Sequence, residues 1–218
     1  DDIIIGNTGN DYLRGGDGDD RFEISQGDGV DDFDGGAGTD TIVATEDNVT
    51  IGINNHFNPA DSIEEISGNG RSGVTVAGDS SNNNMDFSET TLTDIDNIDG
   101  GAGHDTITGS AGDDIIIGNT GNDYLRGGDG NDTLTFMSNQ GNDTVDGGAG
   151  DSWMDTIELS GFDGSTSEDG WTLSLDQGSV VSTDDVSGEM LLSQDSAGSI
   201  TFDDGGTITF ENIENITW

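Results

Sequence analysis

The sequence of 218 residues has no cysteine and one proline, and it has four cationic side chains, all of them arginine. The absence of cysteine excludes disulfide bonds and thiolate metal sites as the means of holding a fold. No apolar run approaches the roughly 20 residues that a membrane-spanning helix needs. Hydrophobic residues make up 29% of the chain, against a usual share of about 45–50%. An ordinary apolar core is therefore too small to stabilise a chain of this length alone.

Negative charge and glycine are abundant. The chain has 46 acidic residues, a formal net charge of −42 and 37 glycines. Such charge with so little hydrophobicity predicts disorder, because the carboxylates repel one another, unless a partner neutralises them. An abundant hard cation is the natural candidate. The same charge excludes nucleic acid and anionic membrane surfaces as partners, and we expect no membrane insertion.

A nine-residue pattern organises about half of the chain. The stretch DDIIIGNTGNDYLRGGDG at residues 1–18 returns unchanged at residues 113–130. It belongs to the repeat G-G-x-G-x-D-x-U-x, in which U is a large apolar residue, and eleven units fall into blocks 1–43 and 100–158. The aspartates at the sixth position are Asp2, Asp11, Asp20, Asp31, Asp40, Asp105, Asp114, Asp123, Asp132, Asp143 and Asp155. The apolar residues at the eighth position are Ile4, Leu13, Phe22, Phe33, Ile42, Ile107, Ile116, Leu125, Leu134, Val145 and Ile157.

Each position of the repeat has a physical reason. Glycine adopts positive φ without strain, so the backbone can turn sharply and expose carbonyl oxygens. The aspartate adds a carboxylate at the end of the turn, and Ca²⁺ prefers a cage of carboxylate and carbonyl oxygens. The last residues form a short strand whose eighth side chain points inward. Two units then make one 18-residue coil, and units two apart can share an ion. An unchanged 18-residue repeat presents the same ligands to each neighbour, although a recent duplication would also produce it.

These residues resemble the repeats-in-toxin (RTX) family, whose nonapeptide binds Ca²⁺ in a β-helical coil. The resemblance implies an all-β fold, a right-handed parallel β-roll or β-solenoid with two calcium-binding blocks. It also implies Ca²⁺ as cofactor, at roughly 6–10 ions, held by the sixth-position aspartates and by carbonyl oxygens of the turns. It implies export by the type I secretion machinery and folding in extracellular calcium, hence a secreted or cell-surface location. The candidate metal residues are the eleven aspartates together with Gly15, Asp17, Gly127 and Asp129.

Several units depart from the pattern. Gln26 and Ser138 replace the first glycine, Asn139 replaces the second, and the unit at 147–158 carries a three-residue insertion. Ions beside these units are the ones that the repeat supports least.

The remaining segments lack the nonapeptide. Residues 44–99 are expected to be a β-rich connection, solenoid-like from about residue 73, and residues 159–218 a β-rich cap or flanking segment. The sequence DDGG at 203–206 predicts a hairpin turn. The C-terminal region resembles the tails of large secreted RTX proteins, where the export signal lies.

A second motif recurs as SIEEI, DIDNI and NIENI, starting at residues 62, 94 and 212. The middle copy runs directly into the second block, so we interpret it as a ramp that brings a strand into register. The last copy precedes the end of the sequence, where either another roll follows or a cap covers the open edge.

Catalytic sites of the common kinds do not appear in the sequence. It contains neither an HExxH zinc motif nor a G-x-S-x-G serine elbow. His56 and His104 lie far apart and are interpreted as ordinary surface residues, and pairs of carboxylates are expected by accident among so many acids. The chain is therefore predicted not to be an enzyme. The three tryptophans, Trp153, Trp171 and Trp218, could form a sugar-binding platform, but core or cap packing is the simpler use.

The leading hypothesis is a calcium-binding module that folds after type I secretion and forms a structural part of an extracellular, adhesin-like protein. Two alternatives from other classes stay open. One is a self-assembling surface-layer or filament subunit, because solenoid ends can stack on one another. The other is a carbohydrate-binding module of an extracellular enzyme, with a cell-surface or glycan ligand.

Overall fold

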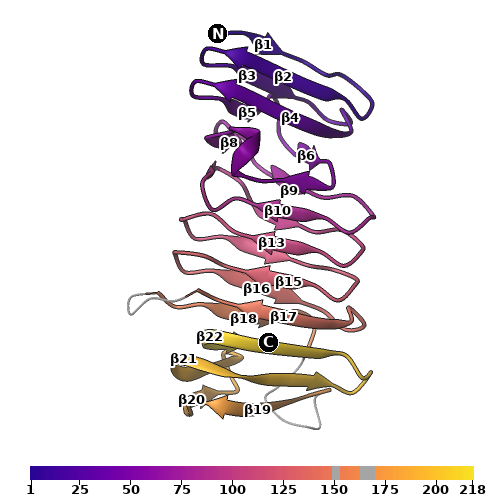
Figure 1. Cartoon of the computed structure of the whole chain (residues 1–218). Helices are drawn as coiled ribbons and strands as arrows, with labels where there is room; N and C mark the ends of the chain where they lie inside the picture. Colours follow the sequence, from indigo (N-terminus) through magenta and orange to yellow (C-terminus); the bar gives the residue numbers. More distant parts are fainter. Residues whose placement is uncertain (149–152, 163–169) are drawn as a thin grey trace.

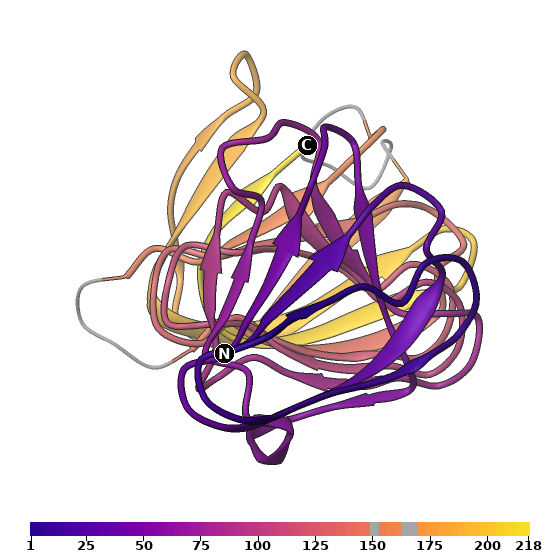
Figure 2. The same cartoon turned by 90° about the horizontal axis from the view of Figure 1, so that it is seen from above.

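The computed structural model describes residues 1–148, 153–162 and 170–218. The chain winds as a solenoid of short, mainly parallel strands, with the N-terminus at one end and an antiparallel meander at the other (Figure 1). Viewed from above, the strands of successive coils stack over one another (Figure 2). Among the described residues, the helical content is one 3₁₀ turn, Pro59–Asp61. The expected all-β solenoid is confirmed.

The strands are short because few residues separate one glycine-rich turn from the next. The first roll, residues 1–43, contains β1 (Ile3–Ile4), β2 (Tyr12–Asp17), β3 (Arg21–Ile24), β4 (Val30–Ala37) and all but the last residue of β5 (Thr41–Ala44). The second roll, residues 100–158, contains β13 (Thr106–Thr108), β14 (Ile115–Ile117), β15 (Tyr124–Arg126), β16 (Thr133–Phe136), β17 (Asn142–Asp146) and all but the last residue of β18 (Thr156–Leu159). Strands two apart in sequence pair in parallel, so that β13 pairs with β15 and β14 with β16.

The connecting segment continues the solenoid with a different cross-section. Its strands are β6 (Thr50–Ile53), β7 (His56–Phe57), β8 (Glu65–Ser67), β9 (Thr75–Ala77), β10 (Asn84–Asp86), β11 (Thr91–Thr93) and β12 (Asn97–Asp99). Here strands three apart pair: β11 with β8, β12 with β9 and β13 with β10. Two coils of three strands therefore separate the two rolls, whose coils have two strands each.

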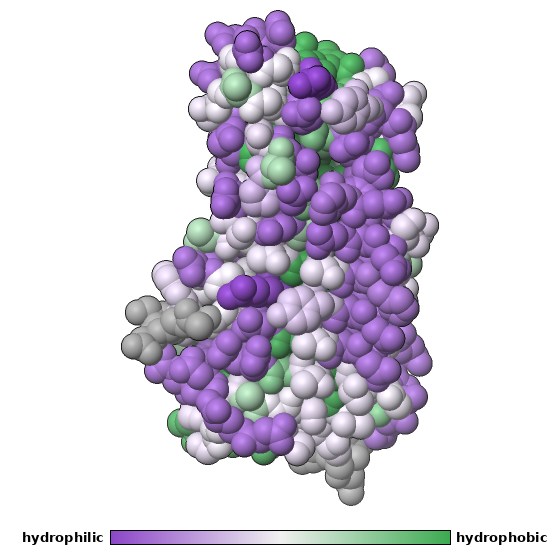
Figure 3. All heavy atoms as spheres, viewed as in Figure 1, coloured by the Kyte–Doolittle hydropathy of each residue, from purple (hydrophilic) through white to green (hydrophobic). Residues whose placement is uncertain are grey.

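The interior is a narrow apolar column. The expectation that eighth-position side chains point inward is confirmed, and the fully buried ones include Phe22, Ile42, Ile107, Ile116, Leu125, Leu134, Val145 and Ile157. Parallel register brings like residues together, as in the pair Ile116 and Leu134. The seventh-position Tyr12 is 64% exposed. Hydrophilic side chains cover much of the face shown in Figure 3, as the high acidic content requires.

The cap is built differently. It comprises β19 (Trp171–Gln177), β20 (Val180–Asp184), β21 (Glu189–Phe202) and β22 (Thr207–Thr217), of which β19, β20 and β22 pair antiparallel with β21. The first part of β22 pairs in parallel with β17 and its last part with β18. One strand thus forms the final coil of the solenoid and attaches the meander. The turn between β21 and β22 confirms the hairpin predicted at residues 203–206. The described part of the chain contains no helix with the length and hydrophobicity needed to span a bilayer.

Candidate metal centre

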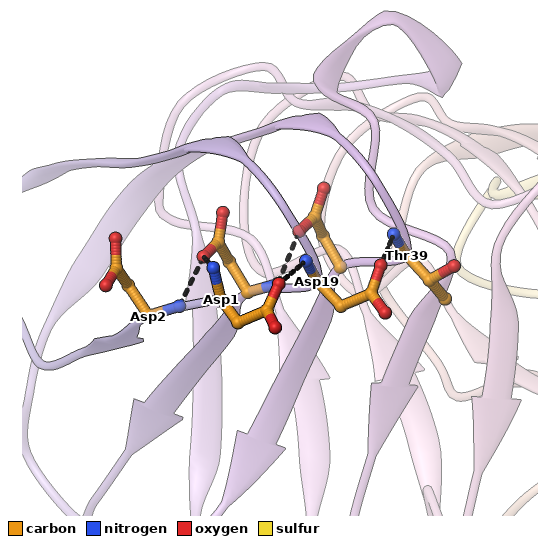
Figure 4. A network of polar contacts seen from close by, with 6 residues as sticks. Asp1, Asp2, Asp19 and Thr39 are labelled. Atoms are coloured by element: carbon orange, nitrogen blue, oxygen red, sulfur yellow. Dashed lines mark hydrogen bonds and ion pairs between the residues drawn. The ribbon is translucent and has the colours of Figure 1, made fainter.

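The sixth-position aspartates stack above one another at the turns. In each stack the backbone N–H of one aspartate donates to the carboxylate of the aspartate one coil later, as from Asp105 to Asp123 Oδ1 at 2.8 Å and from Asp123 to Asp143 Oδ1 at 2.9 Å. We call these stacks aspartate ladders. Figure 4 shows the network around Asp1, Asp2, Asp19 and Thr39 at the start of the first roll. The four ladders are Asp2–Asp20–Asp40, Asp11–Asp31, Asp105–Asp123–Asp143 and Asp114–Asp132–Asp155.

The second carboxyl oxygen of many ladder aspartates is buried without a hydrogen-bond partner. These oxygens are Oδ2 of Asp11, Asp20, Asp40, Asp105, Asp123 and Asp132. A buried carboxylate oxygen without a partner carries a large desolvation cost. Each such oxygen is therefore a strong acceptor for a cation or a proton, and the ladders place these oxygens at regular intervals.

In the units that have a first glycine, that glycine faces this oxygen. A Cβ added at Gly100 would lie 2.7 Å from Asp105 Oδ2 and 3.0 Å from the carbonyl oxygen of Gly118, the first glycine of the next coil. The same two kinds of oxygen would overlap a Cβ at Gly15 and at Gly127. A carboxylate oxygen of one coil and a carbonyl oxygen of the next coil thus both lie against the α-carbon of the first glycine, where a side chain would overlap them. These are the oxygen ligands that Ca²⁺ accepts.

Burial also changes the acidity of the ladders. It raises the pKa of Asp132 and Asp143 to about 7 and the pKa of Asp105 and Asp155 to about 6, because desolvation disfavours the charged carboxylate. Burial therefore favours neutralisation of these groups, by a proton or by a cation.

A second ladder, which the sequence reasoning missed, runs beside the first in the opposite direction. Here the fifth-position N–H of one coil donates back to the side chain of the coil before it, as from Asp19 to Asp1 Oδ1 at 2.9 Å and from Asn131 to Asp113 Oδ1 at 2.8 Å. His104 takes part, since its Nδ1 accepts the N–H of Asn122 at 2.8 Å. His104 is exposed, as expected of a surface residue, and it also accepts a hydrogen bond within the turn. The available signal was the frequency of Asp and Asn at the fifth position.

Asp114 differs from the other ladder residues. Its Oδ2 accepts the N–H of Ser110 at 2.6 Å and the Ser110 hydroxyl at 2.9 Å, because serine stands where most units have their second glycine. This carboxylate is satisfied by its own turn. The turn at Asp114 is consequently the weakest candidate for a cation within the second roll.

Substitution at the second glycine by asparagine leaves the turn intact. Asn7, Asn119 and Asn139 all have φ close to 60°, the left-handed conformation that asparagine tolerates. The departure at Asn139 therefore preserves the backbone path. Residues 149–152, which include the fourth-position glycine of the last unit, Gly150, and the start of its insertion, lie outside the described residues.

The remaining candidate residues fall on the outside of the turns. The side chains of Asp17 and Asp129 are exposed. No group of three or more His, Cys, Asp or Glu side chains converges within the described residues. Any cation between the coils would therefore take most of its ligands from main-chain carbonyls, with one or two carboxylates.

The tryptophans do not form a shared surface. Trp171 is 1% exposed and packs against Trp218 with 5.9 Å between ring centroids, whereas Trp153 lies in the last unit of the second roll. Trp171 and Trp218 pack within the cap, and the carbohydrate-binding alternative gains no support from these two rings.

A family model for the RTX calcium-binding nonapeptide repeat, described as four copies, matches residues 1–30, 27–42, 91–125, 99–134 and 135–155. The chain belongs to the RTX repeat family. Its RTX matches cover both rolls and their ladders, and they identify calcium as the cation of this repeat. No curated protein matches the chain.

Proposed function

We propose that this RTX chain is a calcium-driven folding module in which ions between successive coils neutralise the ladders. The observation that supports it most directly is the row of buried Oδ2 atoms without partners. Each would bind an ion that a carbonyl oxygen of the next coil also contacts, and for Asp20, Asp105 and Asp132 that carbonyl belongs to a first glycine. Calcium supplies positive charge and a tolerant coordination geometry at that place.

The ligand assignment extends the predictions from the sequence. The eleven sixth-position aspartates would supply carboxylate oxygens, with Asp114 the weakest, and the glycines of the turns, Gly15 and Gly127 among them, would supply carbonyl oxygens. Asp17 and Asp129 would contribute through their main chain, since their side chains are exposed. The expected total is roughly 6–10 ions. The division into blocks 1–43, 44–99, 100–158 and 159–218 is part of the same proposal.

The energy that calcium would supply matches what such a chain lacks. Extracellular calcium modules bind with Kd near 10⁻⁴–10⁻³ M. At a tenfold excess of calcium, one site stabilises the fold by about 1.4 kcal/mol. About eight sites would then contribute on the order of 11 kcal/mol, similar to the net stability of a whole domain.

The biological setting we propose is extracellular. A net charge of −42 keeps the chain extended where calcium is scarce, which suits export by a type I secretion system, and the ions then fold it outside the cell. The folded module would act as a structural part of a secreted or cell-surface, adhesin-like protein and not as a catalyst.

The test is a calcium titration of the full chain followed by far-ultraviolet circular dichroism. The variants Asp20→Ala and Asp123→Ala remove buried ladder carboxylates, and we expect their midpoints to move several-fold to higher calcium with reduced cooperativity. Asp176→Ala, an exposed acid in the cap, is the matched control and should titrate like the parent chain. Unchanged midpoints for both ladder variants would contradict the ligand assignment.

Self-assembly into a surface layer or filament is the alternative that the same sample can test. Light scattering of the chain in saturating calcium distinguishes the two. A monodisperse monomer would remove the assembly alternative, and growth of large particles would support it.

A further inference from the structure

The motif that recurs as SIEEI, DIDNI and NIENI forms a five-residue corner. The first residue of each copy, Ser62, Asp94 or Asn212, has φ between 54° and 55°, in the left-handed region. Two of the corners stack in space on the last aspartate of a ladder, in the place where the next coil would lie. The corner at 62–66 comes after Asp40 and the corner at 212–216 after Asp155.

The first residue of these two corners takes the place of a first glycine. Between ordinary coils, the carbonyl oxygen of Gly35 lies 2.5 Å from the position of a Cβ on Gly15, one coil earlier. The carbonyl oxygen of Ser62 occupies the same place against Gly35, and that of Asn212 against Gly147. The corner thus presents one of the two oxygen types that converge between nonapeptide turns.

The glutamate in the corner supplies the other oxygen type. Glu64 Oε2 accepts the N–H of Asp40 at 2.6 Å, and Glu214 Oε2 accepts the N–H of Asp155 at 3.0 Å. In an ordinary ladder an aspartate of the next coil accepts this bond. The corner has fewer residues between its first residue and its acid than a nonapeptide turn has. The additional methylene of glutamate provides the reach that the shorter backbone lacks.

The two glutamates differ in their second oxygen. Glu214 Oε1 accepts the N–H of Asp195 at 2.8 Å, so both of its oxygens are bound by backbone donors. Glu64 has no second donor among the described residues, and its side chain is exposed. Below it, Asp40 is fully buried, and its Oδ2 has no partner and lies 2.6 Å from the Cβ position of Gly35. The buried Asp40 oxygen and the Ser62 carbonyl oxygen therefore both lie against the α-carbon of Gly35 and close to one another.

We propose that Asp40, the Ser62 carbonyl and Glu64 form an additional calcium site that ends the first roll, whereas Glu214 closes the second roll without a metal ion. This inference rests on the proposed calcium binding between coils. Water completes the coordination shell of the ion, since Glu64 lies at the surface. The first roll then ends on a cation and the second on the protein's own N–H groups.

The test counts bound calcium per chain by equilibrium dialysis at saturating calcium, for the full chain and for Glu64→Gln, Glu65→Gln and Glu214→Gln. Glutamine keeps the length and one acceptor oxygen, so the bond to the Asp40 N–H is retained while the second anionic oxygen is lost. We expect Glu64→Gln to bind one ion fewer than the parent. Glu65→Gln, a change at the neighbouring residue, and Glu214→Gln should bind the parental number.

Each other outcome is informative. An unchanged count in Glu64→Gln overturns the Glu64 site, and a lost ion in Glu214→Gln overturns the metal-free closure. The substitution Glu64→Gln should remove one terminal ion and leave the fold unchanged. Failure of this variant to reach the parental circular dichroism at saturating calcium therefore also contradicts the proposal. Absence of bound calcium in the parent chain refutes the proposed function itself, a result distinct from all of these.

Discussion

Strand β22 pairs with both the second roll and the rest of the cap, yet the two regions bury different kinds of side chain. The turns of the roll bury carboxylates such as Asp132, which is 0% exposed and has an oxygen without a partner. The cap buries Trp171, Ile200 and Phe210. Its buried hydroxyl, on Ser196, donates to the carbonyl of Ser193 at 2.5 Å. Among the described residues, the cap leaves one buried side-chain atom without a partner, Asn215 Oδ1, whereas the second roll leaves three carboxylate oxygens unpaired.

This difference predicts where dependence on calcium lies. A fold with an apolar core, in which nearly all buried polar groups have hydrogen-bond partners, has little need of a ligand to satisfy them. A fold with buried unpaired carboxylates gains stability from anything that binds them in the native state. Calcium should therefore control the rolls far more strongly than the cap.

The largest expected effect is that of chelation. Removing calcium should abolish most of the β signal in circular dichroism, because the ladder carboxylates then repel one another. In a Trp153→Phe background, the fluorescence emission reports on Trp171 and Trp218 in the cap. As calcium is lowered, this emission should stay native-like after the β signal of the rolls has been lost. Coincident loss of both signals would show that the cap has no stability of its own.

Loss of the cap's largest buried side chain should destabilise the cap and leave calcium binding by the rolls nearly unchanged. Trp171→Ala should cost about 3–5 kcal/mol of cap stability, the usual range for a buried aromatic residue. The calcium midpoint of the rolls should stay within about twofold, less than the effect of one lost site. Thermal unfolding followed at the remaining tryptophans reports the first effect, and Trp153→Ala is the control at an exposed position. A large shift in the calcium midpoint would show that the cap governs the rolls.

The paired substitutions Gly127→Ala and Gly112→Ala test the space between coils. A methyl group at Gly127 would overlap Asp132 Oδ2 and the Gly147 carbonyl oxygen, while at Gly112 the nearest atom is Ser110 Oγ at 3.6 Å. We expect a loss of about 1–3 kcal/mol for the first change. For the second we expect less than about 0.5 kcal/mol. Urea unfolding in saturating calcium measures both. Equal effects would mean that the space beside Gly127 has no special role.

The smallest expected effect is a shift with pH. Because burial raises the folded-state pKa of Asp132 and Asp143 to about 7, the metal-free rolls bind more protons when folded than when unfolded. The stability that these protons contribute without calcium should therefore be highest below about pH 4, fall as pH rises from about 4 to about 7, and be lost above that. The calcium midpoint should correspondingly increase when pH is lowered from 7.5 to 5.5, as protons compete for the same oxygens. Circular dichroism titrations at the two pH values test the sign, and a midpoint that decreases would contradict it.

The repeat made much of the solenoid predictable. A fixed period places its residues on fixed faces, so inward side chains such as Phe22 and Leu125 could be identified by position alone. The turn at residues 203–206 was also evident, since glycine and aspartate stop a strand whatever surrounds it.

Features that depend on contacts between coils were not accessible in this way. The acceptor role of His104 and the bond from Ser110 to Asp114 appear when the stacking of turns fixes which groups meet. The corner glutamates were visible as a recurring motif. Their relation to the ladders depends on the left-handed backbone at Ser62 and Asn212, which no composition rule assigns to them. The three-stranded coil of the connecting segment likewise results from register rather than from local pattern.

The two hydrogen-bond ladders that run in opposite directions through each turn have an evolutionary consequence. Every regular coil offers its neighbours on both sides the same set of donors and acceptors, as the identical residues 1–18 and 113–130 illustrate. Copying or deleting one whole coil therefore leaves each junction chemically unchanged. A gene built from such coils can gain or lose a regular eighteen-residue coil while the ladder hydrogen bonds on either side are kept.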